Sequence, residues 1–136
     1  MELDKSFAVA FAGMSAQSER LKIIAENLAN ADSTATTPDA DPYKRKIVTF
    51  QDVLDRSLGV DTVKVAGVRQ VDGGFGRLYE PGHPAADANG YVKTPNVNSI
   101  TELMDMREAE RSYEANLNVI DAAKSMLSRV IDLLHG

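Results

Sequence analysis

The sequence predicts an α+β protein whose long N- and C-terminal helices pair as a coiled-coil-like domain around a small β-rich middle domain. All five prolines and seven of the nine glycines lie between Ala31 and Ser99, and these residues interrupt regular helices. Both flanks repeat apolar residues at helical spacing. We therefore expect a discontinuous helical domain from residues 1–32 and 99–136, and an outer domain of a β-hairpin and loops from residues 33–98.

The N-terminal flank is expected to be one helix that ends near Asn30. Its large apolar side chains recur at intervals of four, three and seven residues, at Phe7, Phe11, Met14, Leu21 and Leu28. Ser18 and Ala25 occupy the two remaining positions of this seven-residue repeat, which is typical of a coiled-coil seam. Asn30 is the expected stop because asparagine tolerates the left-handed conformation in which many helices end.

The C-terminal flank is expected to be a longer helix that starts at a capping box of Ser99 and Glu102. Ten positions follow at alternating spacings of three and four: Leu103, Met106, Glu110, Tyr113, Leu117, Ile120, Lys124, Leu127, Ile131 and Leu134. A buried carboxylate must be paired, so Glu110 is expected to fix the register or to contact a partner. No glycine or proline interrupts residues 99–135, which would span about 55 Å at 1.5 Å per residue.

The middle of the chain is expected to hold short strands and turns. Residues 46–50 have strand composition, and the basic residues 44–46 are interpreted as the solvated start of that strand. Asp72-Gly73-Gly74 lies between the segments 68–71 and 75–79. A turn signal between two such segments predicts a small hairpin.

The predicted C-terminal helix is too long to be covered by this chain alone. A compact chain of this length has a diameter of about 37 Å, and pairing the flanks leaves roughly ten residues of the longer helix without a partner. Apolar residues outside the repeat widen its face, at Val119, Ala123, Met126 and Val130. The apolar residues of both repeats are therefore the candidates for helix packing and self-assembly, and a monomeric hairpin with a frayed end is the alternative.

The sequence predicts no catalytic, metal, cofactor or small-molecule substrate site. His83 and His135 lack a second ligand at metal-binding spacing, and there is no cysteine for a thiolate site. The carboxylates early in the C-terminal helix are interpreted as a charged face, because the Glu-x-x-His pattern of di-metal sites is absent. A formal net charge of −5 argues against a nucleic-acid partner, which requires a basic face.

Neither a membrane span nor a cleaved signal peptide is expected. No apolar run approaches the ~20 residues that a membrane helix needs. Residues 7–14 are apolar or glycine and resemble the core of a signal peptide. However, Glu2 and Asp4 make the leading segment acidic, and the apolar repeat continues to Leu28.

The two flanks resemble the terminal motifs of bacterial flagellar axial proteins, the family of rod, hook and hook-associated subunits. Residues 15–21 and 25–32 are similar to the N-terminal signature of the family, and residues 102–104 and 111–116 are similar to its C-terminal motif. The family positions carried over to this sequence are Asn27, Leu28, Ala29, Asn30, Arg111, Tyr113 and Asn116.

The middle of the chain narrows the resemblance to the rod of the flagellar basal body. Residues 79–93 and 95–98 are similar to proximal-rod subunits, and the short middle fits them better than the larger hook or distal-rod subunits. Residues 33–41 match no motif of the family. The resemblance therefore implies no contacts for that segment.

The resemblance implies a structural subunit of the flagellar proximal rod and not an enzyme. Such subunits leave the cytoplasm through the flagellar type III export apparatus without a cleaved signal peptide. They assemble helically in the periplasm, where the rod transmits motor torque for motility. The implied partners are copies of the chain, other rod subunits, and membrane-ring and export-apparatus proteins.

Three alternatives remain open at this stage. They are another rod or hook-type axial subunit, a cytosolic coiled-coil adaptor or export chaperone, and an enzyme with an unrecognised carboxylate site. We also expect the termini of a free rod subunit to be loosely ordered, since isolated helices depend on packing for stability. Docking at the growing tip of the rod would then couple folding to binding.

Overall fold

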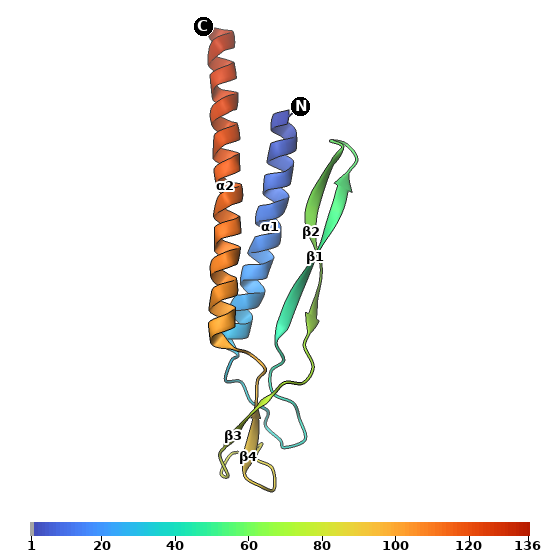
Figure 1. Ribbon diagram of the computed structural model, residues 1–136, viewed down its shortest axis with the longest axis vertical. Helices are drawn as coiled ribbons and strands as arrows, with labels where there is room; N and C mark the ends of the chain where they lie inside the picture. The colour runs from blue at the N-terminus through green and yellow to red at the C-terminus, as the bar shows by residue number, and fades with distance from the viewer. Residues whose placement is uncertain (1) are drawn as a thin grey trace. The chain divides into compact units, whose positions relative to one another are not determined.

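The computed structural model, which describes residues 2–136, has an α+β fold (Figure 1). Along the chain the elements are α1 (Glu2–Ala29), β1 (Lys46–Asp55), β2 (Val60–Gln70), β3 (Gly76–Tyr79), β4 (Tyr91–Thr94) and α2 (Ser99–His135). β1 pairs with β2, and β3 pairs with β4, which gives two separate two-stranded sheets. The two helices lie where the spacing of apolar residues predicts them.

The chain divides into two compact units, each built from segments distant in sequence. The first consists of Met1–Leu21, Thr49–Gly67 and Arg107–Gly136, and the second of Lys22–Val48 and Val68–Met106. Each helix, and each strand of the β1–β2 hairpin, contributes residues to both units. The predicted division into residues 1–32 with 99–136, and residues 33–98, stays a prediction.

In the first unit, α1 and α2 run antiparallel and approach each other through small side chains (Figure 1). Gly13 faces Asn116, and a Cβ atom placed on Gly13 would lie 2.7 Å from the Asn116 Nδ2 atom. Two turns further along α1, Arg20 Nη2 lies 3.6 Å from Glu108 Oε2. The buried apolar side chains of this unit are Ala10, Ala16, Ala109, Ile120 and Ala123. Glycine and alanine at the contact allow the two helix backbones to lie close together.

This contact lies one residue to the N-terminal side of most positions in the predicted repeats. On α1, Ala10 is buried, whereas the next residue, Phe11, is 55% exposed. On α2, Ala109 is buried and Glu110 is exposed. The expectation that Glu110 occupies a buried seam position is therefore wrong, because the helix turns its small neighbour toward α1 and its carboxylate toward solvent.

The β1–β2 hairpin turns at residues 56–59. Asp55 Oδ1 accepts hydrogen bonds from the Ser57 hydroxyl at 2.6 Å and from the Ser57 backbone N–H at 3.0 Å. These bonds, the hydroxyl bond most of all, lower the pKa of Asp55. Gly59 closes the turn with a φ of 66°, a left-handed conformation that favours glycine.

The hairpin predicted at Asp72-Gly73-Gly74 is wrong, because these residues connect the two sheets. β2, which precedes them, pairs with β1, and β3, which follows them, pairs with β4. Gly73 and Gly74 both have positive φ. The turn signal is therefore real, but the strands on either side of it are not partners.

In the second unit, β3 and β4 form an antiparallel ribbon, in which Leu78 lies opposite Val92 and Tyr79 opposite Tyr91. Val92 is buried, and the two tyrosine rings pack edge to face with 5.3 Å between their centroids. In the loop between the strands, Asp87 Oδ1 accepts hydrogen bonds from the backbone N–H groups of Asn89 and Tyr91. The bond from Tyr91 is the largest cause of the lowered pKa of Asp87.

α1 ends at Ala29 through a side-chain hydrogen bond. The Asn30 side-chain amide donates to the backbone carbonyl of Glu26 at 2.9 Å, which satisfies an acceptor in the last turn. No non-glycine residue within 2–136 has a positive φ. The predicted stop near Asn30 is therefore confirmed, but the predicted left-handed conformation of that residue is wrong.

α2 begins with Asn98 as its N-cap, one residue before the predicted cap. Asn98 Oδ1 accepts hydrogen bonds from the backbone N–H groups of Ile100 at 3.0 Å and Thr101 at 3.3 Å. The predicted capping box of Ser99 and Glu102 is wrong, because Asn98 supplies the acceptor and the Glu102 carboxylate has other partners.

We expect Asn98→Ala to lower the free energy of unfolding by about 1 kcal/mol, because two backbone donors lose their acceptor. Ser99→Ala removes a hydroxyl from the neighbouring position and is the matched control, with an expected change below about 0.5 kcal/mol. Urea unfolding of the purified chain, followed by circular dichroism, measures both values. A larger loss of unfolding free energy for Ser99→Ala than for Asn98→Ala would support the predicted capping box instead.

Candidate functional site

A network of polar side chains joins several segments of the second unit. We call it the polar cluster, and it consists of Glu26, Asn27, Tyr43, Arg45, Lys46, Asn96, Glu102 and Asp105. It links the end of α1, the start of β1, the segment before α2 and the first turns of α2. Buried polar networks specify one arrangement of the chain when all members are satisfied.

Asn27 is the centre of the polar cluster and is 1% exposed. Its Nδ2 atom donates to the backbone carbonyl of Lys46 at 2.8 Å and to Glu102 Oε2 at 3.3 Å. Its Oδ1 atom accepts from the Tyr43 hydroxyl at 2.7 Å and from the Lys46 backbone N–H at 3.0 Å. These four bonds use the full hydrogen-bonding capacity of an amide side chain.

Glu102 is the buried charge of the cluster, with 1% of its side chain exposed, and Arg45 is its partner. Arg45 Nε donates to Glu102 Oε1 at 2.5 Å, and Arg45 Nη2 donates to Asp105 Oδ2 at 3.3 Å. Removing one partner of a buried ion pair leaves an uncompensated charge, which is strongly destabilising. The position of Arg45 is therefore a requirement for burying the Glu102 carboxylate.

Asn96 holds the backbone around Arg45 in place. Its Oδ1 atom accepts the Arg45 backbone N–H at 2.7 Å, and its Nδ2 atom donates to the carbonyls of Val71 and Gly73 at 2.8 and 2.9 Å. The Val71 backbone N–H in turn donates to the Arg45 carbonyl at 2.8 Å. Asn96 thus fixes the backbone of Arg45 and the segment that connects the two sheets.

Tyr43 completes the cluster as a neutral donor. Burial above all, and then the nearby carboxylates of Glu26 and Glu102, raise the pKa of its phenol. Within residues 2–136 no group of three His, Asp or Glu side chains is placed to hold a metal ion. The polar side chains of the cluster bind one another and the backbone, so the arrangement supports a structural role.

The polar cluster was missed in the sequence, where residues 44–46 were interpreted as solvated. All three side chains are partly buried, and Lys44 pairs with the exposed Asp72 at 2.8 Å. Arg45 and Lys46 instead pair with Glu102 and Glu26. The available signal was Asn27, a family-motif residue one turn from the buried Ile24 on α1.

The second candidate site is the C-terminal part of α2, residues 124–135, which we call the tip. Every residue of the tip is exposed. Residue 13 of α1 faces residue 116 of α2, and residue 20 faces residue 108. Because the helices are antiparallel, continuing this register to the start of α1 places Glu2 opposite residue 126 or 127. Most of the tip therefore has no α1 residue beside it. Its large apolar side chains are between 42% and 82% exposed: Met126, Leu127, Val130, Ile131, Leu133 and Leu134.

The predicted packing residues differ widely in their exposure. Ile120 is buried. The half-buried ones are Phe7, Met14, Leu21, Leu28, Met106 and Tyr113. The exposed ones are Phe11, Leu103, Leu117, Leu127, Ile131 and Leu134. Their role in contacts between copies stays a prediction.

The family-motif positions fall at the C-terminal end of α1 and within the first half of α2. Asn27 and Asn30 form the contacts described above, Leu28 is half-buried, and Ala29 is exposed. On α2, Arg111 is exposed, and Tyr113 and Asn116 are half-buried. Asn116 Nδ2 donates to the Ser112 carbonyl at 2.9 Å, which holds its side chain along the helix and against Gly13.

None of the helices within residues 2–136 combines the length and apolar character needed to cross a bilayer.

Comparison with known protein families gives a match at each end of the chain. Residues 7–35 match the family described as flagella basal body rod protein. Residues 88–133 match the family described as flagellar basal body rod FlgEFG protein C-terminal. Both matches include residues of the motifs recognised in the sequence.

Relatives with similar sequences extend along almost the whole chain. The chain is 52% identical to the flagellar basal-body rod protein FlgC of Agrobacterium fabrum, over 98% of this chain and 96% of the relative. It is 46% identical to FlgC of Salmonella typhimurium, over 98% of both chains. It is 32% identical to FlgC of Bacillus subtilis, over 94% of this chain and 95% of the relative.

We expect Arg45→Met to lower the free energy of unfolding by about 3–5 kcal/mol, because the buried Glu102 carboxylate loses its charged partner. Lys44→Met removes the neighbouring positive charge and is the matched control. Its partner Asp72 is exposed, so the unfolding midpoint should stay within experimental error. Urea unfolding measures both variants, and equal effects would contradict the central role of Arg45.

Proposed function

This chain belongs to the family of flagellar basal-body rod proteins named FlgC, and we propose that it is a structural subunit of the proximal rod. In this proposal copies of the chain assemble helically, together with other rod subunits, and transmit motor torque. Membrane-ring and export-apparatus proteins are further partners. Export follows the flagellar type III route without cleavage of a signal peptide, and the assembled rod lies in the periplasm.

The observation that carries the proposal is the apolar surface that the single chain leaves exposed. Burying one large aliphatic side chain contributes about 1.5–3 kcal/mol. Six such side chains on the tip together offer on the order of 10 kcal/mol to a contact with another chain. A large exposed apolar patch on a water-soluble subunit marks an interaction surface.

The predicted coiled-coil-like pairing is part of the same proposal. Within the chain, the α1–α2 contact uses alanines and Gly13, and the larger residues of the repeats lie beside it. Phe7 and Phe11 stack on α1 with 6.1 Å between ring centroids, and Leu117 is 40% exposed on α2. We assign these larger residues to packing against the helices of neighbouring copies.

The lack of contacts at the tip indicates whether the tip becomes ordered before or during assembly. A helix end with few tertiary contacts frays, because helices of this kind owe their stability to packing. We therefore assign ordering of the tip to the moment of assembly. The ordering cost lowers the net affinity, and the apolar area buried offsets it.

We expect Leu117→Asp to abolish swimming in cells that have no other copy of this chain. The new charge is tolerated in the free subunit, because residue 117 is partly exposed. It is costly once the residue is buried against another helix. Motility plates and electron microscopy of isolated basal bodies give the readout.

Asn118→Asp is the control for this experiment, because it places the same charge on the exposed neighbouring residue. Cells with this variant should swim normally. Wild-type swimming by Leu117→Asp cells would contradict the assignment of the repeat to contacts between copies.

We also expect trypsin to cut α2 of the free subunit first at Arg129, because this residue lies beyond the part of α2 that has α1 residues beside it. Cleavage at Arg20, which pairs with Glu108, should be much slower. In isolated basal bodies the tip should become resistant. Mass spectrometry of timed digests identifies the sites, and a tip that resists cleavage in the dilute free subunit would refute the coupling of order to assembly.

A further inference from the structure

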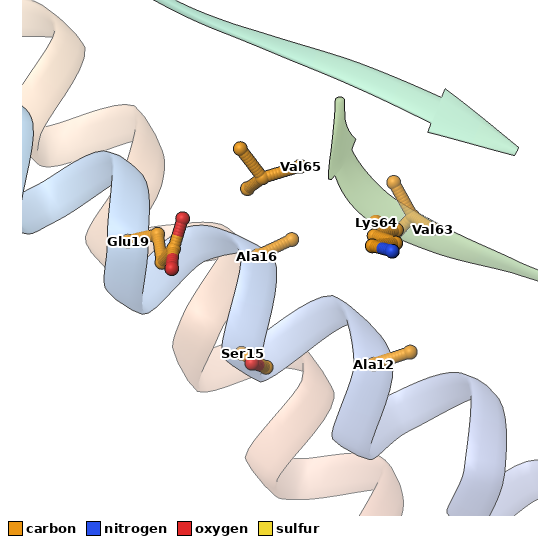
Figure 2. A pocket seen from close by; sticks show the side chains of 7 residues that line it. All are labelled: Ala12, Ser15, Ala16, Glu19, Val63, Lys64 and Val65. Atoms are coloured by element: carbon orange, nitrogen blue, oxygen red, sulfur yellow. The ribbon is translucent and has the colours of Figure 1, made fainter. Parts of the chain in front are cut away.

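In the first unit, α1 lies between α2 and the β1–β2 hairpin (Figure 1). A hollow lies between α1 and β2 (Figure 2). The hollow has a volume of about 270 Å³. Its α1 wall is made of Ala12, Ser15, Ala16 and Glu19, and its β2 wall of Val63, Lys64 and Val65. Figure 2 shows the methyl groups of Ala12 and Ala16 pointing toward the strand that carries the two valines.

A second hollow, of about 320 Å³, lies between the first turns of α1, the start of β2 and α2. Its lining includes Ser6 and Val9 of α1, Val60 of β2, and Val119 of α2. Residues 9, 12, 16 and 19 follow one another at intervals of three or four, so they lie on one face of α1. Both hollows therefore open along the same face of α1, which we call the groove.

The groove is too wide to be filled by the side chains that line it. Alanine and serine on α1 are too short to reach the valines of β2, and atoms that border a void lose dispersion contacts on that side. A cavity of about 150 Å³ accommodates a benzene-sized ring. Each hollow thus has room for at least one large aliphatic side chain from another source.

We propose that the groove holds the tip of a second copy of this chain. The inference rests on the proposed rod function, and it names the surface that one subunit presents to the next. Two features of the tip match the groove, namely its helical row of apolar side chains and its charges.

The apolar row of the tip runs through Met126, Val130 and Leu134 at intervals of four, which is the spacing of a helix that docks in a groove. These side chains are 47% to 81% exposed in the single chain. The rim of the groove carries Glu19 and Lys64. Arg129, which flanks this row on the helix, supplies the charge opposite to that of Glu19.

The tip of the same chain does not supply this occupant. It continues α2 beyond the start of α1, whereas the first hollow borders residues 12–19 in the middle of α1. A tip inserted into the groove of a second copy leaves the tip of that copy free for a third. Contacts of this head-to-tail kind generate a helical polymer when the rotation from copy to copy does not close a ring.

Cysteine cross-linking tests the proposal directly, because the natural chain contains no cysteine. Two full-length variants, Ala12→Cys and Val130→Cys, are produced together in motile cells, and their basal bodies are isolated and oxidised. We expect a disulfide-linked dimer that contains one chain of each kind. A chain that carries both substitutions should give a ladder of linked copies.

Ser18→Cys is the control for Ala12→Cys, because Ser18 is exposed and belongs to the predicted seam of α1 and not to the groove. The proposal is overturned if both variants enter basal bodies and the tip does not link to residue 12. It is also overturned if the tip links to residue 18 at least as well. Absence of the wild-type chain from basal bodies would instead refute the proposed function.

A variant that fills the groove gives an independent readout. Ala12→Phe should leave the helical circular dichroism of the free subunit unchanged and reduce swimming to the background level. Lys22→Phe adds the same ring at an exposed position of α1 outside both the groove and the predicted seam, and is the control. Normal swimming by Ala12→Phe cells would overturn the proposal, and the cross-linking result stands whether or not this variant folds.

Discussion

The buried carboxylate of Glu102 is the constraint on which the second unit depends. A charge with 1% of its side chain exposed needs a close counter-charge and further hydrogen bonds. Arg45 supplies the charge and Asn27 supplies an amide hydrogen bond. Because these partners come from the residue before β1 and from α1, one carboxylate links three segments that are far apart in the sequence. The end of α1 and the start of α2 are therefore held by polar contacts and not by a large apolar core.

The helices could be predicted from the sequence because their signals are local and repeated. The glycine-free stretch before His135 and the apolar periodicity need no knowledge of neighbouring segments. The choice of strand partners does need it, and so Gly73 and Gly74 were assigned to a hairpin although they connect two sheets. The N-cap was displaced by one residue because Asn98 and Ser99 are both good caps and only the backbone geometry decides between them.

The contact face of the helices could not be predicted, for a different physical reason. Periodicity finds the face with the largest apolar side chains, but it does not reveal which chain covers them. Here Ala10, Gly13 and Ala109 form the contact within the chain, and larger residues such as Phe11 remain outside it. The polar cluster was missed because Arg45 and Glu102 are 57 residues apart, and no local pattern connects them.

The tight fit of Gly13 against Asn116 has a consequence for the geometry of a polymer. At position 13 there is no room for a side chain larger than hydrogen unless the Asn116 amide moves. The contact between Gly13 and Asn116 therefore opposes a shift of α1 along α2. The length of helix that protrudes is then the same in every copy. Every copy would therefore present its tip at the same position relative to α1.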